Sequence, residues 1–109
     1  MRDHAKSGAL TEVTFFVLLS LAKPRHGYSI MQFIQEHTAG SLTLGAGTLY
    51  GALTSLTEKG WITPCGEVTD RRKLYRLTPL GQVIVTDELE RLEAVARTAR
   101  TILGGMDHD

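Results

Sequence analysis

The 109-residue sequence holds one cysteine and three prolines, and aromatic residues make up only 6% of it. The single thiol, Cys65, excludes an internal disulfide framework and a zinc site built from several thiolates, and it fits a reducing cytosol. The longest unbroken apolar run, Phe15 to Leu19, is far too short to cross a membrane. We therefore expect a cytoplasmic protein with no disulfide bond and no membrane partner.

The sequence also has no net charge, because 12 basic residues balance 12 acidic ones. Long-range attraction to a polyanion is therefore absent, and any nucleic-acid contact depends on local clusters of cations. With 42% hydrophobic and 22% charged residues, the composition is that of an ordinary globular protein. A chain of this length buries one modest core.

Recognisable catalytic and cofactor motifs are missing as well. The third glycine of a dinucleotide-binding fingerprint starting at Gly45 is replaced by Tyr50, and no robust strand precedes it. The histidines have no ligand partner three or four residues away, which argues against a metal site; they are His4, His26, His37 and His108. We expect neither an enzyme nor a cofactor.

The amino-terminal region loosely mimics a secretory signal, with Arg2 and Lys6 ahead of the mostly apolar stretch 13–22. Glu12 and Thr14 interrupt the approach to that stretch, and a helical pattern continues across the supposed cleavage site. We therefore interpret the stretch as a buried helix.

Helical spacing of apolar residues predicts three short helices within about sixty residues. The first begins after Thr11, the second at residues 26–28 and the third near Gly47, and they end at Pro24, Gly40 and Gly60. The third has one apolar stripe, at Leu49, Ala52, Leu53 and Leu56. Because each helix buries only one stripe, the three must pack on one another.

The pattern then changes to two short strands, 61–63 and 72–77, joined by a loop at 64–70. Pro79 starts a final helix, which Gly104 and Gly105 end. From Pro79 to Leu103 this helix is about 37 Å long, more than a core of this size covers. Its apolar residues form a heptad seam for a second copy of the chain, at Val85, Leu89, Leu92, Ala96, Ala99 and Leu103.

Three helices followed by a hairpin predict a mainly α (α+β) fold, the winged helix-turn-helix, with a two-stranded wing and a long C-terminal helix. In such folds the third helix enters the major groove of DNA, and the wing lies along the backbone. We expect a winged-helix DNA-binding domain at residues 1–78 and a dimerisation helix at residues 79–109. A two-fold dimer places its recognition helices one DNA turn, about 34 Å, apart on a palindromic operator.

Local charge favours contact with double-stranded DNA. No acidic residue interrupts the chain from Arg71 to Thr86, whereas four acidic residues follow at 87–93. The predicted phosphate contacts are the basic residues of the wing, Arg71, Arg72, Lys73 and Arg76. The alternative is that these cations form a solvated loop tip and that the fold is a protein-interaction module without DNA binding.

Several short strings together resemble the PadR family of transcriptional regulators: residues 26–28 (HGY), 47–50 (GTLY) and 72–78 (RKLYRLT), followed by Gly81. The match runs from residue 8 to Gly81 in the order and spacing of the family. The resemblance implies an amino-terminal winged-helix domain, a carboxy-terminal dimerisation helix and, usually, a repressor. The short tail is similar to the smaller PadR class with a single carboxy-terminal helix.

The outward face of the third helix lacks the commonest base readers, since it has no arginine, lysine, asparagine or glutamine before Lys59. Its candidate DNA contacts are Gly47, Thr48, Tyr50, Gly51, Thr54 and Ser55. We expect specificity to rest on hydroxyl and methyl contacts and on DNA shape, while the backbone carries most of the affinity. Leu74 stands where the family usually has an aromatic residue. In a structural role, Tyr28 and Tyr50 are expected to be partly buried, with their rings in the core and their hydroxyls at the surface; in a functional role, the hydroxyl contacts a phosphate. We favour the structural role for Tyr28 and leave both roles open for Tyr50.

Some relatives in the family bind aromatic drugs in the dimer cavity, but residues 79–109 contain no aromatic residue. The sequence therefore gives no support to a small-molecule effector. Cys65 lies near Arg71 and Arg72, which leaves open both a redox-sensing thiol and an inert one.

Overall fold

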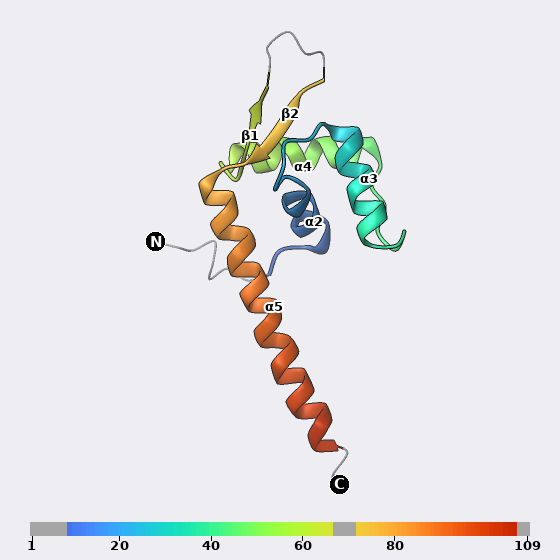
Figure 1. Ribbon diagram of the computed structural model, residues 1–109, viewed down its shortest axis with the longest axis vertical. Coiled ribbons are helices and arrows are strands. Elements are labelled where there is room, and N and C mark those ends of the chain that lie inside the picture. Colours follow the sequence, from blue (N-terminus) through green and yellow to red (C-terminus); the bar gives the residue numbers. More distant parts are fainter. Residues whose placement is uncertain (1–8, 67–71, 107–109) are drawn as a thin grey trace.

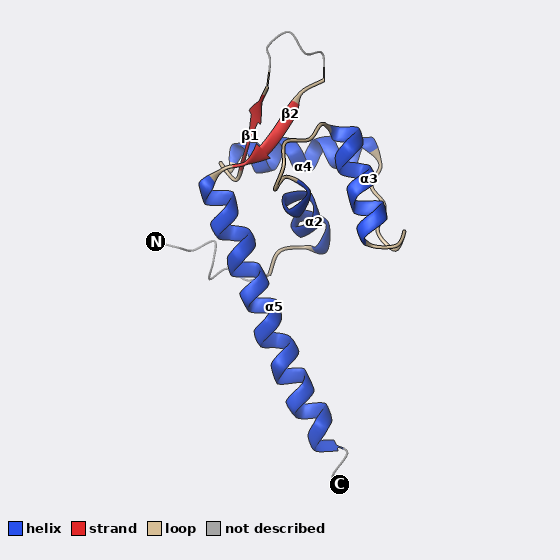
Figure 2. Ribbon diagram, viewed as in Figure 1, coloured by secondary structure: helices blue, strands red, loops and turns tan. Residues whose placement is uncertain are grey.

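The computed structural model describes residues 9–66 and 72–106. Its elements are α2 (Glu12–Ser20), α3 (Gly27–His37), α4 (Ala46–Glu58), β1 (Ile62–Cys65), β2 (Leu74–Leu77) and α5 (Pro79–Met106). Figures 1 and 2 show α2, α3 and α4 clustered next to the two strands, with α5 projecting away from them. The predicted mainly α fold, with a two-stranded wing and a long C-terminal helix, is confirmed.

Helix α2 begins at the predicted cap but ends earlier than the sequence indicates. The Thr11 hydroxyl accepts a hydrogen bond from an N–H of the first turn at 3.1 Å. The helix ends at Ser20, so the expectation that it continues to Pro24 is wrong. The Leu21 N–H donates to the Leu18 carbonyl at 3.0 Å, and this tight final turn stops the helix before the proline is reached.

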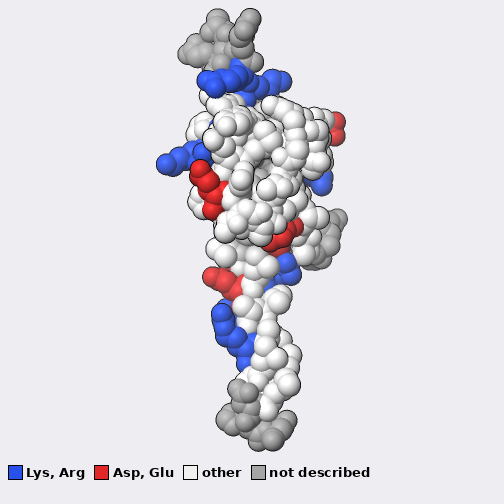
Figure 3. Space-filling model, turned by 90° about the vertical axis from the view of Figure 1, so that its right-hand side faces the viewer, with Lys and Arg blue, Asp and Glu red and all other residues white. Residues whose placement is uncertain are grey.

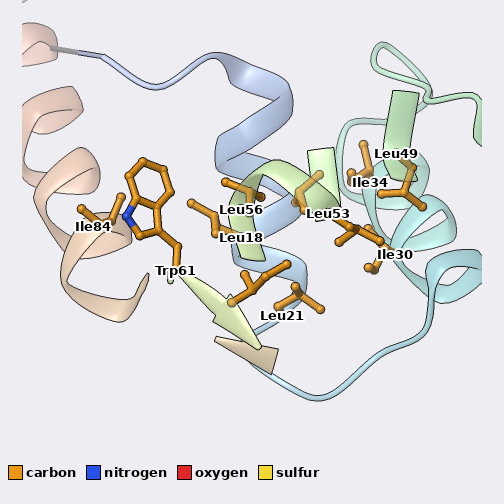
Figure 4. Packing of buried hydrophobic residues seen from close by; sticks show 11 residues of the cluster. Leu18, Leu21, Ile30, Ile34, Leu49, Leu53, Leu56, Trp61 and Ile84 are labelled. Carbon is orange, nitrogen blue, oxygen red and sulfur yellow. The ribbon is translucent and has the colours of Figure 1, made fainter. Parts of the chain in front are cut away.

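The three short helices pack on one another through the stripes that the sequence predicts (Figure 4). Leu49, Leu53 and Leu56 of α4 are buried against α2 and α3, and Trp61 lies between this cluster and α5. The core consists of Val17, Leu18, Leu21, Ile30, Ile34, Leu49, Leu53, Leu56, Trp61, Ile62 and Ile84. Only the first turns of α5 contribute to it, through Ile84 and its neighbours.

The wing is a two-stranded antiparallel sheet whose register places Pro64 opposite Tyr75. Strand β1 covers Ile62–Cys65 and not 61–63, so Pro64 lies in a strand where the sequence predicted a loop. Proline is tolerated there because Tyr75 directs its own N–H and carbonyl away from β1, to Arg25. Strand β2 begins at Leu74 and not at residue 72.

Helix α5 begins at Pro79, as predicted, and is fixed to the winged body at once. The Thr78 hydroxyl accepts the Gly81 N–H at 3.0 Å and donates to the Gly60 carbonyl at 2.6 Å. A Cβ atom on Gly81 would lie 1.9 Å from the Trp61 carbonyl oxygen. Only glycine therefore lets the helix approach this closely.

Helix α5 continues to Met106, so the expectation that Gly104 and Gly105 end it is wrong. Glycine costs only about 1 kcal/mol relative to alanine inside a helix, which does not force an end. The buried residues of α5, which are Gly81, Ile84 and Glu88, all lie in its first half. Within the described residues, no helix has both the length and the apolar character that a membrane span requires.

Candidate nucleic-acid interface

The side of α4 that faces away from the core is lined with small and hydroxyl-bearing residues. All the predicted DNA contacts on this helix are exposed there: Gly47, Thr48, Tyr50, Gly51, Thr54 and Ser55. The Thr54 hydroxyl donates to the Tyr50 carbonyl at 3.0 Å, which fixes its side chain. Apart from the adjacent residues and the backbone of α4 itself, no heavy atom of the protein lies within 4 Å of a Cβ position built on Gly47 or Gly51. The α4 backbone is therefore open to close approach by a ligand.

Tyr28 and Tyr50 lie on the surface, so the expectation that their rings are partly buried in the core is wrong. Tyr28 is 63% exposed and Tyr50 is 51% exposed. Ile30 and Leu49, close to them on the same two helices, occupy the core instead. The Tyr50 hydroxyl lies against the start of α3, where a Cβ on Gly27 would be only 2.5 Å away. Gly27 therefore leaves room for the phenol of Tyr50.

An open pocket of about 440 Å³ lies where α3, α4 and the wing meet. It is lined by His26, Gly27, Tyr28, Tyr50, Arg72, Lys73 and Tyr75. Burial raises the pKa of Tyr75, and the nearby Tyr50 raises it further. Cations, hydroxyl donors and the amino-terminal end of α3 together suit a phosphate oxygen.

The wing carries the cations that the sequence predicts. Arg72, Lys73 and Arg76 are exposed on or beside β2, and Arg71 lies outside the described residues. In Figure 3, Lys and Arg residues gather towards the wing end of the molecule, whereas basic and acidic residues are mixed further along. Because Arg72 and Lys73 line one pocket with Tyr50, this positive charge lies beside α4.

One residue of this region, Arg25, was not among the predicted site residues. Its backbone forms a bridge with Tyr75 of β2, and its guanidinium donates to two groups on α2 and α3. A bridge of one residue leaves no periodic pattern in a sequence. The available signal was a cation directly before the HGY string at residues 26–28.

Helix α5 exposes an apolar surface that includes most of the predicted seam. Leu89, Leu92, Ala99 and Leu103 are exposed, Ala96 is half-buried, and Val85 packs partly against the core of its own chain. Leu103 is 60% exposed. The structure adds exposed apolar residues outside the seam, at Val95, Ile102 and Met106. These three lie on the same side of α5 as the buried Ile84 and Glu88, beyond the end of the core. The predicted heptad seam did not include them.

The remaining reactive groups lie apart from this surface. Cys65 is a free, half-buried thiol at the end of β1. Both carboxylate oxygens of the buried Glu88 accept hydrogen bonds from Arg91, at 2.6 and 2.9 Å, and these bonds hold the pKa of Glu88 below its usual value. Among the described residues, no three histidine, cysteine, aspartate or glutamate side chains come together as a metal site requires.

Three packed helices, an exposed third helix and a two-stranded wing define a winged-helix protein. Within the winged-helix class, the chain belongs to the PadR-like family of transcriptional regulators, whose family model matches residues 17–87. Because members of this family regulate transcription, the expectation that the chain is not an enzyme is confirmed.

Known proteins share sequence and fold with this chain. It is 33% identical over 85 residues to transcriptional regulator Rv3488 of Mycobacterium tuberculosis, covering 76% of this chain and 74% of that protein. A transcriptional regulator from Clostridium thermocellum is 29% identical, with a TM-score of 0.67 over 81% of this chain and 88% of that one. Bacillus subtilis PadR in complex with operator DNA is 25% identical, with a TM-score of 0.63 over 72% of this chain and 47% of that one. A protein with this fold is thus seen bound to operator DNA.

Proposed function

We propose that the chain is a sequence-specific DNA-binding repressor that binds a palindromic operator as a homodimer. In this proposal α4 is the recognition helix, and the wing follows the phosphate backbone beside it. The protein acts in the cytoplasm by occupying DNA. The observation that carries the proposal is that Tyr50 of α4 and two cations of the wing, Arg72 and Lys73, border one pocket.

Phosphate contacts supply most of the affinity in this proposal. Arg72, Lys73 and Arg76 are exposed on the wing, and Arg71 belongs to the same predicted set. Each phosphate that these cations neutralise releases counterions, so binding strength depends on local positive charge and not on the net charge of zero. Tyr50 adds a hydroxyl donor at the edge of the same surface.

Base recognition then falls to the exposed side of α4. Thr48, Thr54 and Ser55 offer hydroxyl groups, and the two threonines also offer methyl groups that suit the methyl of thymine. Gly47 and Gly51 let the helix backbone come close to the floor of the groove. Because this face has no side chain that bonds a base in bidentate fashion, DNA shape contributes much of the specificity.

A second copy of the chain covers the exposed apolar side of α5 in this proposal. Leu89, Leu92 and Leu103 are exposed in a single chain, although their spacing is that of a buried heptad seam. Ala96 and Ala99 in the same seam are small enough for two helices to approach closely. A two-fold axis through this contact presents two α4 helices to successive major grooves, about 34 Å apart.

Binding to a random-sequence DNA duplex, followed by fluorescence anisotropy at several salt concentrations, tests the DNA contact. We expect affinity to fall steeply with salt, and Lys73→Ala or Arg72→Ala to reduce the slope of log K against log salt by about one unit. Arg97→Ala, an exposed α5 position far from the wing in sequence, is the control and should leave the slope unchanged. Absence of salt-sensitive binding by the wild type would instead favour the protein-interaction module.

Sedimentation velocity at micromolar concentration tests the dimer. We expect the wild type to sediment as a dimer and Leu103→Glu to dissociate it, because the new carboxylate would be buried in the seam. Thr101→Glu places the same charge on the same turn, outside the seam, and should leave the dimer intact. A wild type that sediments as a monomer contradicts the proposed assembly.

A further inference from the structure

The loop between α2 and α3 joins the wing to the helices. The Arg25 N–H donates to the Tyr75 carbonyl at 3.1 Å, and the Tyr75 N–H donates to the Arg25 carbonyl at 2.9 Å. A further bond, from the Leu77 N–H to the Leu21 carbonyl at 3.1 Å, attaches the other end of β2 to the same loop. Strand β2 therefore lies between β1 on one side and this loop on the other.

The side chain of Arg25 fixes the loop to both flanking helices. Its Nε donates to the Ser20 carbonyl at 2.7 Å, one of the acceptors that the end of α2 leaves without a helical partner. Its Nη1 donates to the Ser29 hydroxyl at 3.0 Å, in the first turn of α3. The guanidinium carbon also lies 4.8 Å from the centre of the Phe33 ring, on which His37 stacks at 3.9 Å.

These contacts give a single residue two attachments. The backbone of Arg25 is part of the wing, and its side chain is bonded to α2 and α3. The side chain therefore ties the backbone bridge to both flanking helices. Together with the bond between Leu77 and Leu21, Arg25 fixes the wing relative to the helices.

We infer that Arg25 is a positioning residue for DNA binding: it holds the base of the wing so that Arg72 and Lys73 reach phosphates while α4 lies in the groove. This inference rests on the proposed function. Its cation bonds within the protein and is not a phosphate ligand. Lysine is a poor replacement, because one ammonium group cannot reproduce the planar fork that bonds in two directions and stacks on a ring.

The test compares Arg25→Lys, which keeps the charge, with Arg97→Lys as the matched control on the exposed side of α5. We expect Arg25→Lys to weaken duplex binding about tenfold, as the loss of a charged hydrogen bond does, and to reduce the salt slope, because misplaced wing cations neutralise fewer phosphates. Lys73→Ala alone should reduce that slope by about one unit, and should reduce it by less when it is added to Arg25→Lys. Ser29→Ala removes only one of the contacts and should weaken binding less, in the same way.

Hydrogen exchange of backbone amides provides a readout that does not depend on DNA. In Arg25→Lys the N–H groups of Tyr75 and Leu77 should exchange faster, while those of the buried Ile34 and Leu53 keep the wild-type rate. A salt slope that Arg25→Lys leaves at the wild-type value would show that the wing cations still reach their phosphates and would overturn the inference. Unchanged exchange at Tyr75 would also overturn it. Failure of the wild type to bind DNA counts against the proposed function, and the exchange measurement still tests the anchor.

Discussion

Replacing Gly81 with alanine should detach the base of α5 from the winged body. A Cβ at this position would lie 1.9 Å from the Trp61 carbonyl oxygen and 2.9 Å from the Trp61 carbonyl carbon. The Leu77 side chain is also close, at 3.0 Å. Since carbon atoms attract best at about 3.5–4.0 Å, the helix and the backbone of Trp61 must separate by about 1 Å or more.

The magnitude follows from two opposing contributions. Forcing an extra carbon into a packed site costs about 1–3 kcal/mol, and the upper end applies because the atom struck is backbone and not the end of a flexible side chain. Alanine regains about 1 kcal/mol through its higher helix propensity. The net expectation for Gly81→Ala is a loss of about 2 kcal/mol, which in a domain of this size lowers Tm by about 10 °C.

Thermal and urea unfolding followed by circular dichroism measure this change, at one fixed protein concentration because a dimer gains stability by mass action. Gly104→Ala is the matched control: it lies in the same helix, and apart from the adjacent residues and the helix's own backbone no heavy atom lies within 4 Å of its Cβ position. That variant should be unchanged or more stable, by up to about 1 kcal/mol. If both variants shift stability in the same direction, close packing at Gly81 does not hold α5 in place.

The remaining predictions concern α4 and the buried ion pair. Gly51→Ala should stabilise α4 by up to about 1 kcal/mol in urea unfolding, yet weaken binding to duplexes selected by the wild type about tenfold, because its Cβ enters the space that DNA approaches. Unchanged affinity would show that DNA stays away from this position. In the folded protein the pKa of Glu88 is held below its usual value near 4.5, chiefly by the hydrogen bonds from Arg91, so its stabilising effect is present above that value and is lost as pH falls through the lowered pKa. Urea midpoints across pH should show Glu88→Gln less stable at neutral pH and less sensitive to acid than the wild type, and equal acid sensitivity of the two proteins would contradict this.

Much of the fold was predictable because it depends on local periodicity. The stripe of leucines on α4 and the Thr78-Pro79 start of α5 each follow from spacing or backbone chemistry within a few residues. Helix ends were less predictable. The end of α2 depends on a tight turn before Pro24, and the continuation of α5 through Gly104 depends on the modest cost of glycine in a helix.

The candidate site was predictable where it consists of one helix face and was missed where it depends on contacts between segments. Exposure of Thr48 and Ser55 follows from helix geometry once Leu49 is assigned to the core. The exposed ring of Tyr50 depends on the space that Gly27 leaves on another helix. The bridge between Arg25 and Tyr75 joins residues 50 positions apart in sequence, and no periodic pattern of residues predicts an isolated bridge of this kind.

In the proposed dimer, the base of α5 sets how the two winged bodies are placed relative to each other. Gly81 lies against Trp61, and Ile84 and Glu88 are buried further along, so the first turns of the helix pack on the winged body. Beyond Glu88 the helix extends about 27 Å to Met106, and a tilt of about 10° at its base would displace that end by about 5 Å. That displacement exceeds the rise of one base-pair step, roughly 3.4 Å. Movement at the start of α5 would therefore make the distance between the two recognition helices vary by more than one base pair. In the proposed dimer, the close packing at Gly81 therefore serves to keep the separation of two recognition helices constant.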